Sequence, residues 1–449
     1  MYKSKFVKFA IALLISLSTT AFALEVDENE LKSTGTIDTV VFVNYTGPHA
    51  KIDSLKSIKK IGSDLGTVIA ADPEKMTNTG AANKYSVIHA IDPSESGKLD
   101  ADILLIGPNA TVDHIKNLRY IIASYLSSAY GYSEQDAETV AVFVTVYNAV
   151  YRGNTEYFAK KYKNIVNSNL TADKCGLALN YKDWPGKSQI VIPLYDVKGG
   201  LSSVDTSVIS DKEVVKHMQE DDDKNVESRK QMVDIKEREA EEATEKAQEA
   251  QKKAVEEQKK LQEEKQKTQE VKKEAETAKK EAEQAKKVAE KNPNDKKAQE
   301  EAAKKQEVAE EKQEELKAQE EKQAEQEEKT EEAKETAAEK QAVADKKTNE
   351  AQEERKEIAK DQQEVIEKAI KDAATPAVYG MELTDEDQLL STLIKVNSQN
   401  GQIIKTSPVT YIRNRTMFQA GENFIAIAGE NKGNGAVKLV LLSPDTMEI

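Results

Sequence analysis

The stretch from residue 212 to residue 372 constrains the fold of this chain more than any other feature. No aromatic residue occurs between Tyr195 and Tyr379, and no glycine occurs between Gly200 and Gly380. Alanine, glutamate, lysine and glutamine dominate the stretch, and these are strong helix formers. Because it contains so few large apolar side chains, it cannot build a globular core of its own. The sequence therefore predicts a long charged helical rod over residues 211–374.

The charge of the chain is concentrated in this rod. Residues 219–372 contain 48 acidic and 36 basic side chains, a net charge of -12, whereas the whole chain carries -15. Opposite charges often lie four residues apart, as in Glu263 and Lys267, and each such pair stabilises a helix by about 0.2–0.5 kcal/mol. This pairing favours helix over disorder. An acidic chain without a basic stripe argues against a nucleic-acid partner.

Small apolar residues recur every seven positions along the rod. One series reads Ala240, Ala247, Ala254, Leu261, Thr268, Ala275, Ala282 and Ala289, with a partner series that includes the charged Glu257 and Glu264. Beyond residue 295 a second stripe follows in another frame, with expected breaks at Gln323 and Thr330: Ala302, Ala309, Leu316, Ala337, Ala344, Ala351, Ile358 and Val365. An alanine seam buries little area, so a solitary salt-bridged helix and a loose coiled coil both stay open. The coiled coil would allow a homodimer through the rod.

The run Lys291–Asp295 interrupts the rod. Asn292 can serve as a helix N-cap and Pro293 as the first helical residue, so both are candidate hinge residues. The flanking arms, residues 224–291 and 294–370, are of similar length. They could fold back into an antiparallel hairpin. The alternative is a kink in one extended helix, in which about 150 residues would reach on the order of 225 Å.

The first residues have the pattern of a signal peptide. Three lysines, Lys3, Lys5 and Lys8, precede an apolar run from Phe9 to Leu17, and Ala21–Ala23 forms an A-x-A site. This pattern predicts cleavage after Ala23, hence residues 1–23 as the signal peptide. The run is shorter than the ~20 residues that a membrane-spanning helix needs. No later segment is apolar enough to span a bilayer, so the mature chain is expected to be soluble. The signal peptide predicts export to the periplasm or cell envelope.

Residues 24–210 have the composition of a globular α/β domain. Short apolar, β-branched runs predict strands at 39–43, 85–91, 103–106 and 189–194. Helices are expected at 52–65, 112–129, 134–151 and 155–166. Ser133 is the expected N-cap of the third helix, and Asp113 is expected as an acidic residue at the start of the second.

Residues 375–449 predict a small β-rich domain. Expected strands are 393–396, 402–405, 424–428 and 437–442, and Asn400–Gly401 is a strong hairpin signal. Two of these apolar runs end in polar turns like units of a propeller blade, but the segment is too short for a propeller.

The sequence offers few residues for chemistry. The single cysteine, Cys175, excludes an internal disulfide, and the four histidines lie far apart, so neither a metal site nor a cofactor is expected. Gly107 follows a strand and precedes a helix, where α/β domains often bind ligands. Asp113 and His114 could then act as an acid–base pair, although both features also suit a turn and a helix start. No nucleotide-binding or hydrolase motif occurs, and no catalytic residue is assigned.

Aromatic residues supply the remaining candidates. Trp184, in a Trp-Pro-Gly loop, is either a core anchor or a binding contact, and the anchor is favoured. Eight tyrosines crowd the helical part of the N-terminal domain, and packing with hydroxyls at the surface is favoured over a binding face: Tyr120, Tyr125, Tyr130, Tyr132, Tyr147, Tyr151, Tyr157 and Tyr162.

Several N-terminal segments resemble those of a known family: Asn44–Pro48, Val87–Pro93, Leu99–Leu104, Val112–Ile115, Ala129–Ser133, Thr145–Gly153, Trp184–Gly186 and Gln189–Leu194. The chain is similar to the 83/100-kilodalton antigen family of Borrelia and other spirochaetes. The resemblance is closest in the N-terminal domain, whereas the composition of the rod is too generic to count. It implies a spirochaete envelope antigen without an established activity, and it brings no catalytic residues.

These observations favour a non-enzymatic structural or interaction protein of the envelope, in which the rod spaces two domains. Its partner, an envelope protein or a cell-wall component, is not identified by the sequence. The alternative is a ligand-binding or catalytic N-terminal domain that is tethered by the rod.

Overall fold

The computed structural model describes residues 40–45, 52–195, 203–221, 223–387, 389–429 and 437–449. The expected signal peptide lies outside these residues. The chain forms two compact units, residues 1–232 with 360–449 and residues 233–359. No helix among the described residues is long and apolar enough to cross a membrane.

The N-terminal part contains a five-stranded antiparallel sheet in chain order: β1 (Thr77–Gly80), β2 (Tyr85–Ala90), β3 (Asp100–Ile106), β4 (Ser188–Tyr195) and β5 (Ser203–Val204). The predicted strands β2, β3 and β4 are confirmed. The strand predicted at 39–43 is wrong: residue 39 is not described, and Val43 forms only an isolated bridge with Asn180. The sequence missed the polar strand β1 and the two-residue strand β5.

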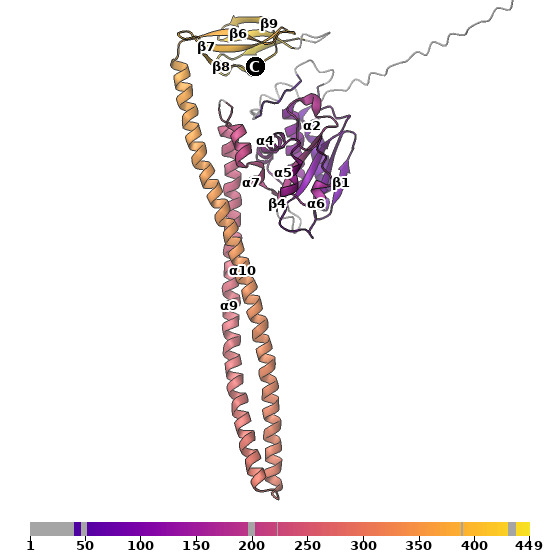
Figure 1. The fold of residues 1–449 in the computed structure, drawn as a ribbon, viewed down its shortest axis with the longest axis vertical. Helices are drawn as coiled ribbons and strands as arrows, with labels where there is room; N and C mark the ends of the chain where they lie inside the picture. Colours follow the sequence, from indigo (N-terminus) through magenta and orange to yellow (C-terminus); the bar gives the residue numbers. More distant parts are fainter. Residues whose placement is uncertain (1–39, 46–51, 196–202, 222, 388, 430–436) are drawn as a thin grey trace, which may run out of the picture. The chain divides into compact units, whose positions relative to one another are not determined.

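Helices accompany this sheet (Figure 1): α2 (Leu55–Ala71), α3 (Ile115–Tyr130), α4 (Glu134–Val150), α5 (Thr155–Lys161), α6 (Asn164–Asn167), the 3-10 helix η1 (Tyr181–Asp183), α7 (Thr206–Ile209) and α8 (Lys212–Met218). The Ser133 cap is confirmed, because its hydroxyl accepts a hydrogen bond from the Asp136 N–H at 3.1 Å. The single helix expected at 155–166 breaks at Tyr162. There the backbone of residues 161 and 163 hydrogen-bonds to Leu99 instead.

Helices α2 and α3 approach each other closely through a glycine. A Cβ atom at Gly62 would lie 1.9 Å from the backbone oxygen of Ile121. Only glycine fits at this crossing, because any side chain would push the two backbones apart. This close approach packs the backbone of α2 directly against that of α3.

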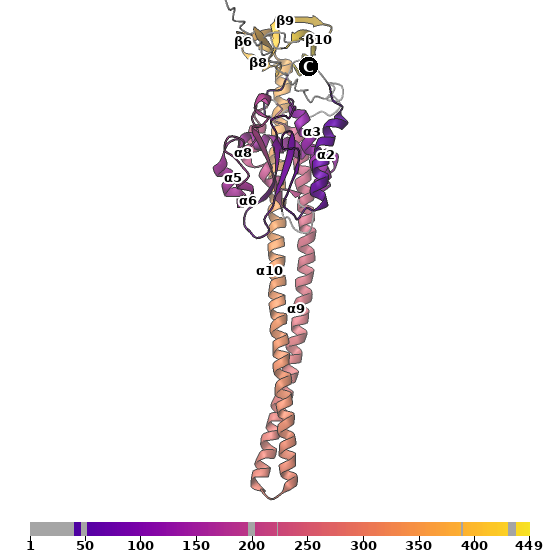
Figure 2. The ribbon, with the colours of Figure 1, turned by 90° about the vertical axis from the view of Figure 1, so that its right-hand side faces the viewer.

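The rod consists of two long helices, α9 (Val226–Lys291) and α10 (Lys296–Ala374). Within residues 233–359 they run side by side and antiparallel (Figures 1 and 2). Ion pairs link the arms from one end to the other: Lys347 contacts Glu239 at 2.7 Å and Lys305 contacts Glu281 at 2.5 Å. The hairpin alternative is therefore the form that the structure has, and the extended helix is not.

The alanine stripes form the seam of this hairpin. Seven-residue series are buried on both arms: Ala240, Ala247, Ala254, Thr268, Ala275, Ala282 and Ala289 on α9, and Ala309, Thr330, Ala344, Ala351 and Ile358 on α10. The break expected at Thr330 is wrong. Its side chain is fully buried, and its hydroxyl lies within hydrogen-bonding distance of the Gln326 and Glu257 backbone oxygens. Threonine continues the stripe because its hydroxyl finds acceptors inside the seam.

The arms are joined by residues 292–295, which include the candidate hinge residues Asn292 and Pro293. The expected cap is displaced: Asn292 closes α9, its side-chain amide donating to the Val288 oxygen at 3.1 Å. Asp295 caps α10, accepting from the Lys297 N–H at 3.0 Å. Aspartate caps better here because its negative charge also favours the helix N-terminus.

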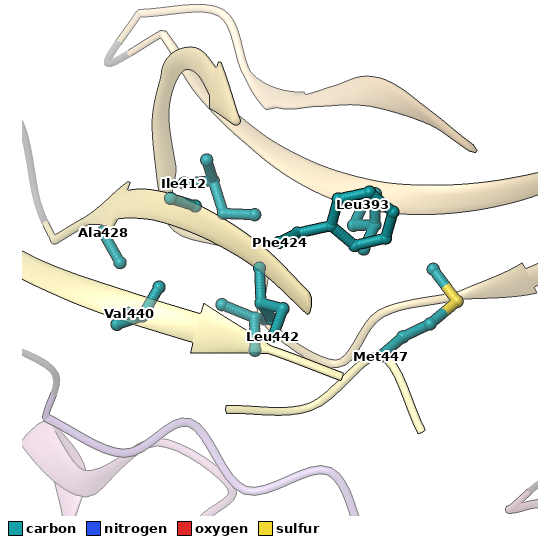
Figure 3. Packing of buried hydrophobic residues seen from close by; sticks show 9 residues of the cluster. Leu393, Ile412, Phe424, Ala428, Val440, Leu442 and Met447 are labelled. Carbon is teal, nitrogen blue, oxygen red and sulfur yellow. The ribbon is translucent and has the colours of Figure 1, made fainter. Parts of the chain in front are cut away.

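The C-terminal part is an antiparallel sheet of six strands: β6 (Ala377–Asp385), β7 (Leu390–Asn397), β8 (Ile403–Thr406), β9 (Ile412–Ala420), β10 (Asn423–Ala428) and β11 (Lys438–Leu442). The order is β11-β10-β9-β7-β6, and β8 pairs with β7. The four predicted strands are present, whereas β6 and β9 were missed. Figure 3 shows the core on one face of the sheet, where Leu393, Ile412, Phe424 and Leu442 pack together.

Candidate functional site

The Gly107 turn is a backbone-packing element. The Gly107 N–H donates to the Lys84 oxygen at 2.6 Å, and the Asn109 N–H donates to the Asn83 oxygen at 2.7 Å. A Cβ atom at Gly107 would lie 2.5 Å from the Asn83 carbonyl carbon. The glycine is therefore explained by close contact with the β1–β2 turn.

Asp113 and His114 lie at the entrance to α3. The His114 ring caps the helix, with Nδ1 accepting from the Lys116 N–H at 3.2 Å. Asp113 precedes the cap, so its expected place in the first helical turn is wrong. Its side chain is 8% exposed, and this burial raises the pKa of the Asp113 carboxyl to about 7. Asp113 is thus the candidate residue that could exchange a proton near neutral pH.

The segment before α2 runs past this helix start. The Tyr45 N–H donates to the Asp113 backbone oxygen at 2.9 Å, and Asn44 Oδ1 accepts from the Ile115 N–H at 2.8 Å. Phe42 follows the same path, and its ring meets the edge of Trp184 with centroids 6.3 Å apart. The structure thereby links Asp113 and Trp184 through one short segment.

Trp184 is a core side chain. It is fully buried, and its Nε1–H donates to the Ala178 oxygen at 2.7 Å. Two residues later the Gly186 N–H donates to the Ile106 oxygen at 2.8 Å, next to the Gly107 turn. This position matches a loop anchor, since a fully buried indole is not accessible to a partner.

The sequence reasoning missed a buried polar cluster around Asp102. His89 and Asp102 are cross-strand partners on β2 and β3, and both are fully buried. Nδ1 of His89 lies 2.5 Å from Asp102 Oδ1, and Nε2 lies 2.8 Å from the Pro73 oxygen. The hydroxyls of Tyr125 and Tyr130 both donate to Asp102 Oδ2. The detectable signal was a histidine and an aspartate inside apolar strands.

The geometry favours a charged pair. Both ring nitrogens of His89 face oxygen atoms, an arrangement that favours the doubly protonated imidazolium form. Burial by itself lowers the pKa of His89, but the hydrogen bond and the charge of Asp102 outweigh it and raise the pKa above 6.5. Because the cluster is sealed from solvent, it ties α3 and the turn after α2 to the sheet rather than reacting with a substrate.

Asp100, the first residue of β3, has a partner of its own. Its Oδ2 accepts from Lys163 Nζ at 2.8 Å, with both side chains 9% exposed. Lys163 Nζ also donates to the backbone oxygen of Asp92 at 2.6 Å. This pair anchors the chain where the expected helix 155–166 breaks.

The tyrosines also belong to the interior. Tyr147 and Tyr162 are fully buried with their hydroxyls 2.8 Å apart. The rings of Tyr151 and Tyr157 stack with centroids 3.6 Å apart, and both hydroxyls donate to Asp211, at 2.8 and 3.2 Å. The predicted packing of these tyrosines is confirmed, but their four hydroxyls make internal hydrogen bonds rather than lying at the surface.

A last polar cluster closes the rod base, defined as residues 219–232 and 360–364. Asp361 Oδ2 accepts from Arg229 at 2.6 Å and from Gln219 at 2.8 Å, and Oδ1 accepts from Lys224 at 3.0 Å. Burial would raise the pKa of Asp361, but the three donors outweigh it and lower the pKa. Among the described residues, no group of three or more histidine, cysteine, aspartate or glutamate side chains could hold a metal ion.

The comparisons with known proteins agree with this architecture. The family described as Borrelia P83/100 protein matches residues 29–449. The chain belongs to this family. No curated protein and no solved structure matches it. Membership covers all three parts of the chain, and it fits an antigen-type protein built around a helical rod.

Proposed function

We propose that this chain is an exported, non-enzymatic structural or interaction protein of the cell envelope, in which the paired arms of the hairpin hold the turn 292–295 away from residues 236 and 354. Family membership and the signal-peptide pattern of residues 1–23 support the compartment. The sealed positions of Trp184, His89 and Asp102 support a non-enzymatic role.

The antiparallel hairpin is the observation that carries the proposal. The arms pair from Lys236–Glu354 to Glu281–Lys305, and apart from Lys236 the buried side chains between these pairs are those of the seam. From residue 236 to residue 291 a helix rises on the order of 80 Å. Residues 236 and 354, where the paired part of the hairpin begins and ends, both lie at the end opposite the turn 292–295. In this proposal the paired arms hold the turn 292–295 on the order of 80 Å from residues 236 and 354.

Two experiments in cells test this proposal. The first is the N-terminal sequence of the mature protein in an envelope fraction, which should begin at Leu24. The second compares proximity labelling from an enzyme inserted at the turn with labelling from one placed after Ile449. Different sets of labelled envelope proteins are expected at the two positions.

A shortened hairpin provides the matched control for length. Deleting residues 268–288 and 298–318 removes three heptads from each arm and keeps the seam in register. A folded variant of this kind should shift the labelling from the turn toward the set seen at the C-terminus. Unchanged labelling would show that rod length has no role. A mature protein found in the cytoplasm would refute the envelope assignment itself.

The raised pKa of Asp113 keeps one alternative in view, a ligand-binding or catalytic N-terminal domain. Under this alternative, Asp113→Asn abolishes a ligand-induced rise in melting temperature in a small-molecule screen, because the variant cannot ionise. Asp183→Asn, on a half-exposed residue of η1, is the control. A screen without any stabilising compound for the parent chain would remove this alternative.

A further inference from the structure

The turn end of the hairpin carries a net positive charge on an otherwise acidic rod. We call residues 286–297 the rod tip; they contain five lysines and two acidic residues, a net charge of +3. The arms behind the tip, residues 236–285 and 298–347, carry 23 basic and 32 acidic side chains, a net charge of -9. In each of the five ten-residue levels behind the tip, the facing segments of the two arms sum to 0 or to a negative charge. Positive charge is therefore concentrated at the end of the hairpin that the turn closes (Figure 2).

The lysines of the rod tip are all exposed: Lys286, Lys287, Lys291, Lys296 and Lys297. None of them forms an ion pair with a carboxylate among the described residues. By contrast, Lys305, farther along α10, pairs across the hairpin with Glu281 at 2.5 Å. Lys312 pairs in the same way with Glu274 at 2.7 Å. The lysines of the rod tip are therefore not needed to hold the two arms together.

Helix formation explains only some of these lysines. At the C-terminal end of α9 a positive charge suits the helix dipole, so Lys287 and Lys291 stabilise that end. Lys296 and Lys297 begin α10, where the dipole favours acidic residues, and the first turn of α10 contains none. Residues that break a local rule of helix stability often serve binding instead. The two lysines at the start of α10 thus point to a partner with negative charge.

We propose that the rod tip binds end-on to the anionic headgroups of a lipid bilayer. This inference rests on the proposed function, in which the paired arms hold the turn 292–295 away from residues 236 and 354. An anionic surface attracts the tip and repels the acidic arms, so it favours contact through the tip. The nearest acidic level of the arms is centred on the order of 15 Å behind the turn. This exceeds the Debye length of ~8 Å at physiological ionic strength, so its repulsion is screened.

The chemistry of the tip favours a lipid surface over an acidic protein. Every residue from 290 to 297 is exposed, so the end of the tip offers no cleft for a partner's side chain. Protein interfaces usually depend on tryptophan, tyrosine or arginine anchors, and the tip contains none of these. Lysine is a flexible point charge rather than a rigid fork, which suits mobile headgroups better than one fixed carboxylate.

The expected strength of binding follows from the charge. Each lysine close to an anionic membrane strengthens binding about fivefold. The net charge of +3 at the tip should therefore give a preference for anionic over neutral vesicles of about a hundredfold. Because the attraction is electrostatic, salt should weaken it.

Co-sedimentation of residues 24–449 with lipid vesicles tests the inference. Phosphatidylcholine vesicles that contain about 30% phosphatidylglycerol should bind the chain at about 0.1 M NaCl. Vesicles of phosphatidylcholine alone should not bind it, and about 0.5 M NaCl should release it from the anionic vesicles.

Two variants with the same net charge locate the contact. The tip variant replaces four lysines of the rod tip: Lys287→Gln, Lys291→Gln, Lys296→Gln and Lys297→Gln. The arm variant replaces four exposed lysines of the arms that also form no ion pair with a described residue: Lys252→Gln, Lys253→Gln, Lys329→Gln and Lys340→Gln. Glutamine is a strong helix former, so the circular dichroism of both variants should match that of the parent. Binding of the tip variant should fall to the level seen with neutral vesicles, whereas the arm variant should bind within about twofold of the parent.

Several results would overturn the inference. They are a parent chain that does not bind anionic vesicles, a tip variant that binds as the parent does, and an equal loss of binding in both variants. Retention of the parent on immobilised polyglutamate, without binding to vesicles, would overturn it in favour of an acidic protein. If the vesicle experiments fail while the mature chain begins at Leu24 and labelling at the turn stays distinct, the lipid contact is refuted and the proposed function is not.

Discussion

The Asp361 cluster should determine whether the rod base stays closed. The side chain of Asp361 is 8% exposed and that of Arg229 is 3% exposed, and they meet at 2.6 Å. Asp361→Ala leaves the buried guanidinium without its counter-charge. Breaking one side of a buried ion pair costs about 3–5 kcal/mol, because the remaining charge stays desolvated. The replacement removes the acceptor of Gln219 and Lys224 as well.

Hydrogen exchange read by mass spectrometry measures this loss locally. Peptides that cover residues 226–232 and 360–364 should exchange at least about a hundred-fold faster in Asp361→Ala, since every 1.4 kcal/mol is a factor of ten. Glu364→Ala is the matched control: it removes another partner of Lys224, but one whose side chain is 46% exposed. Little change is expected there, because exposed ion pairs contribute little.

The pH dependence of hydrogen exchange at the rod base tests the same prediction independently. The folded pKa of Asp361 is lowered below 3.8, so its stabilisation is present above that value and is lost as pH falls through the folded pKa. The protection of the rod-base amides, relative to their intrinsic exchange rate at each pH, should therefore fall under acid conditions in the parent and much less in Asp361→Ala. Equal exchange in Asp361→Ala and Glu364→Ala at neutral pH would refute the argument.

Three further predictions concern the N-terminal core and the rod. The folded pKa of His89 is raised above 6.5, so its ion pair stabilises the fold fully below pH 6.5 and less as pH rises through the folded pKa. Unfolding followed by the fluorescence of Trp184, the single tryptophan, should show this loss of stability. His89→Gln should make the stability of the domain less dependent on pH in this range. Gly62→Ala should destabilise the same domain by about 1–3 kcal/mol or more, because its Cβ overlaps the Ile121 carbonyl; an unchanged urea midpoint would contradict this. Ala351→Leu should lower the melting temperature of the hairpin, with a cost of about 1–3 kcal/mol for overpacking the seam. Circular dichroism at 222 nm measures that change, and the exposed Ala342→Leu is its control.

The rod was readable from the sequence because its signal is long and uniform. The seven-residue stripes and the interruption near Pro293 predicted two arms, and the hairpin was one of two stated outcomes. The choice between them depends on contacts across the arms, such as Glu239 with Lys347, which no local pattern specifies. The seam at Thr330 was misjudged because its polarity was counted without its backbone acceptors, Gln326 on the same helix and Glu257 on the facing helix.

Some strands could be predicted from the sequence and others could not. β2, β3 and β4 are buried on both faces and therefore appear as apolar runs. Strand β9 was missed because Arg413, Asn414 and Arg415 interrupt its apolar pattern, and β1 was missed because Thr77–Gly80 is entirely polar. Such strands are defined by their neighbours in the sheet, not by their own composition.

For the candidate residues, the structural interpretations that the sequence offered describe the fold, whereas an interaction role stays a prediction. Gly107, Asp113, His114 and Trp184 do gather near the start of α3, yet Gly107 and Trp184 serve packing and His114 caps a helix. The His89–Asp102 pair was overlooked because the two residues lie thirteen positions apart in sequence and meet only through the register of β2 with β3.

The hairpin also sets an order in which its contacts can form. Near the turn, Glu281 and Lys305 are 24 residues apart along the chain, whereas Lys236 and Glu354 are 118 apart. Closing the short loop between Glu281 and Lys305 costs less entropy than closing the long one. Pairing of the arms should therefore begin beside Asn292–Asp295 and proceed toward Lys236 and Glu354. Until α10 has been synthesised, the seam of α9 has no partner, and its weak alanine stripe offers little for other chains to bind. A seam built from alanine thus protects the unfinished rod from misassembly, while each added heptad contributes to a stable finished hairpin.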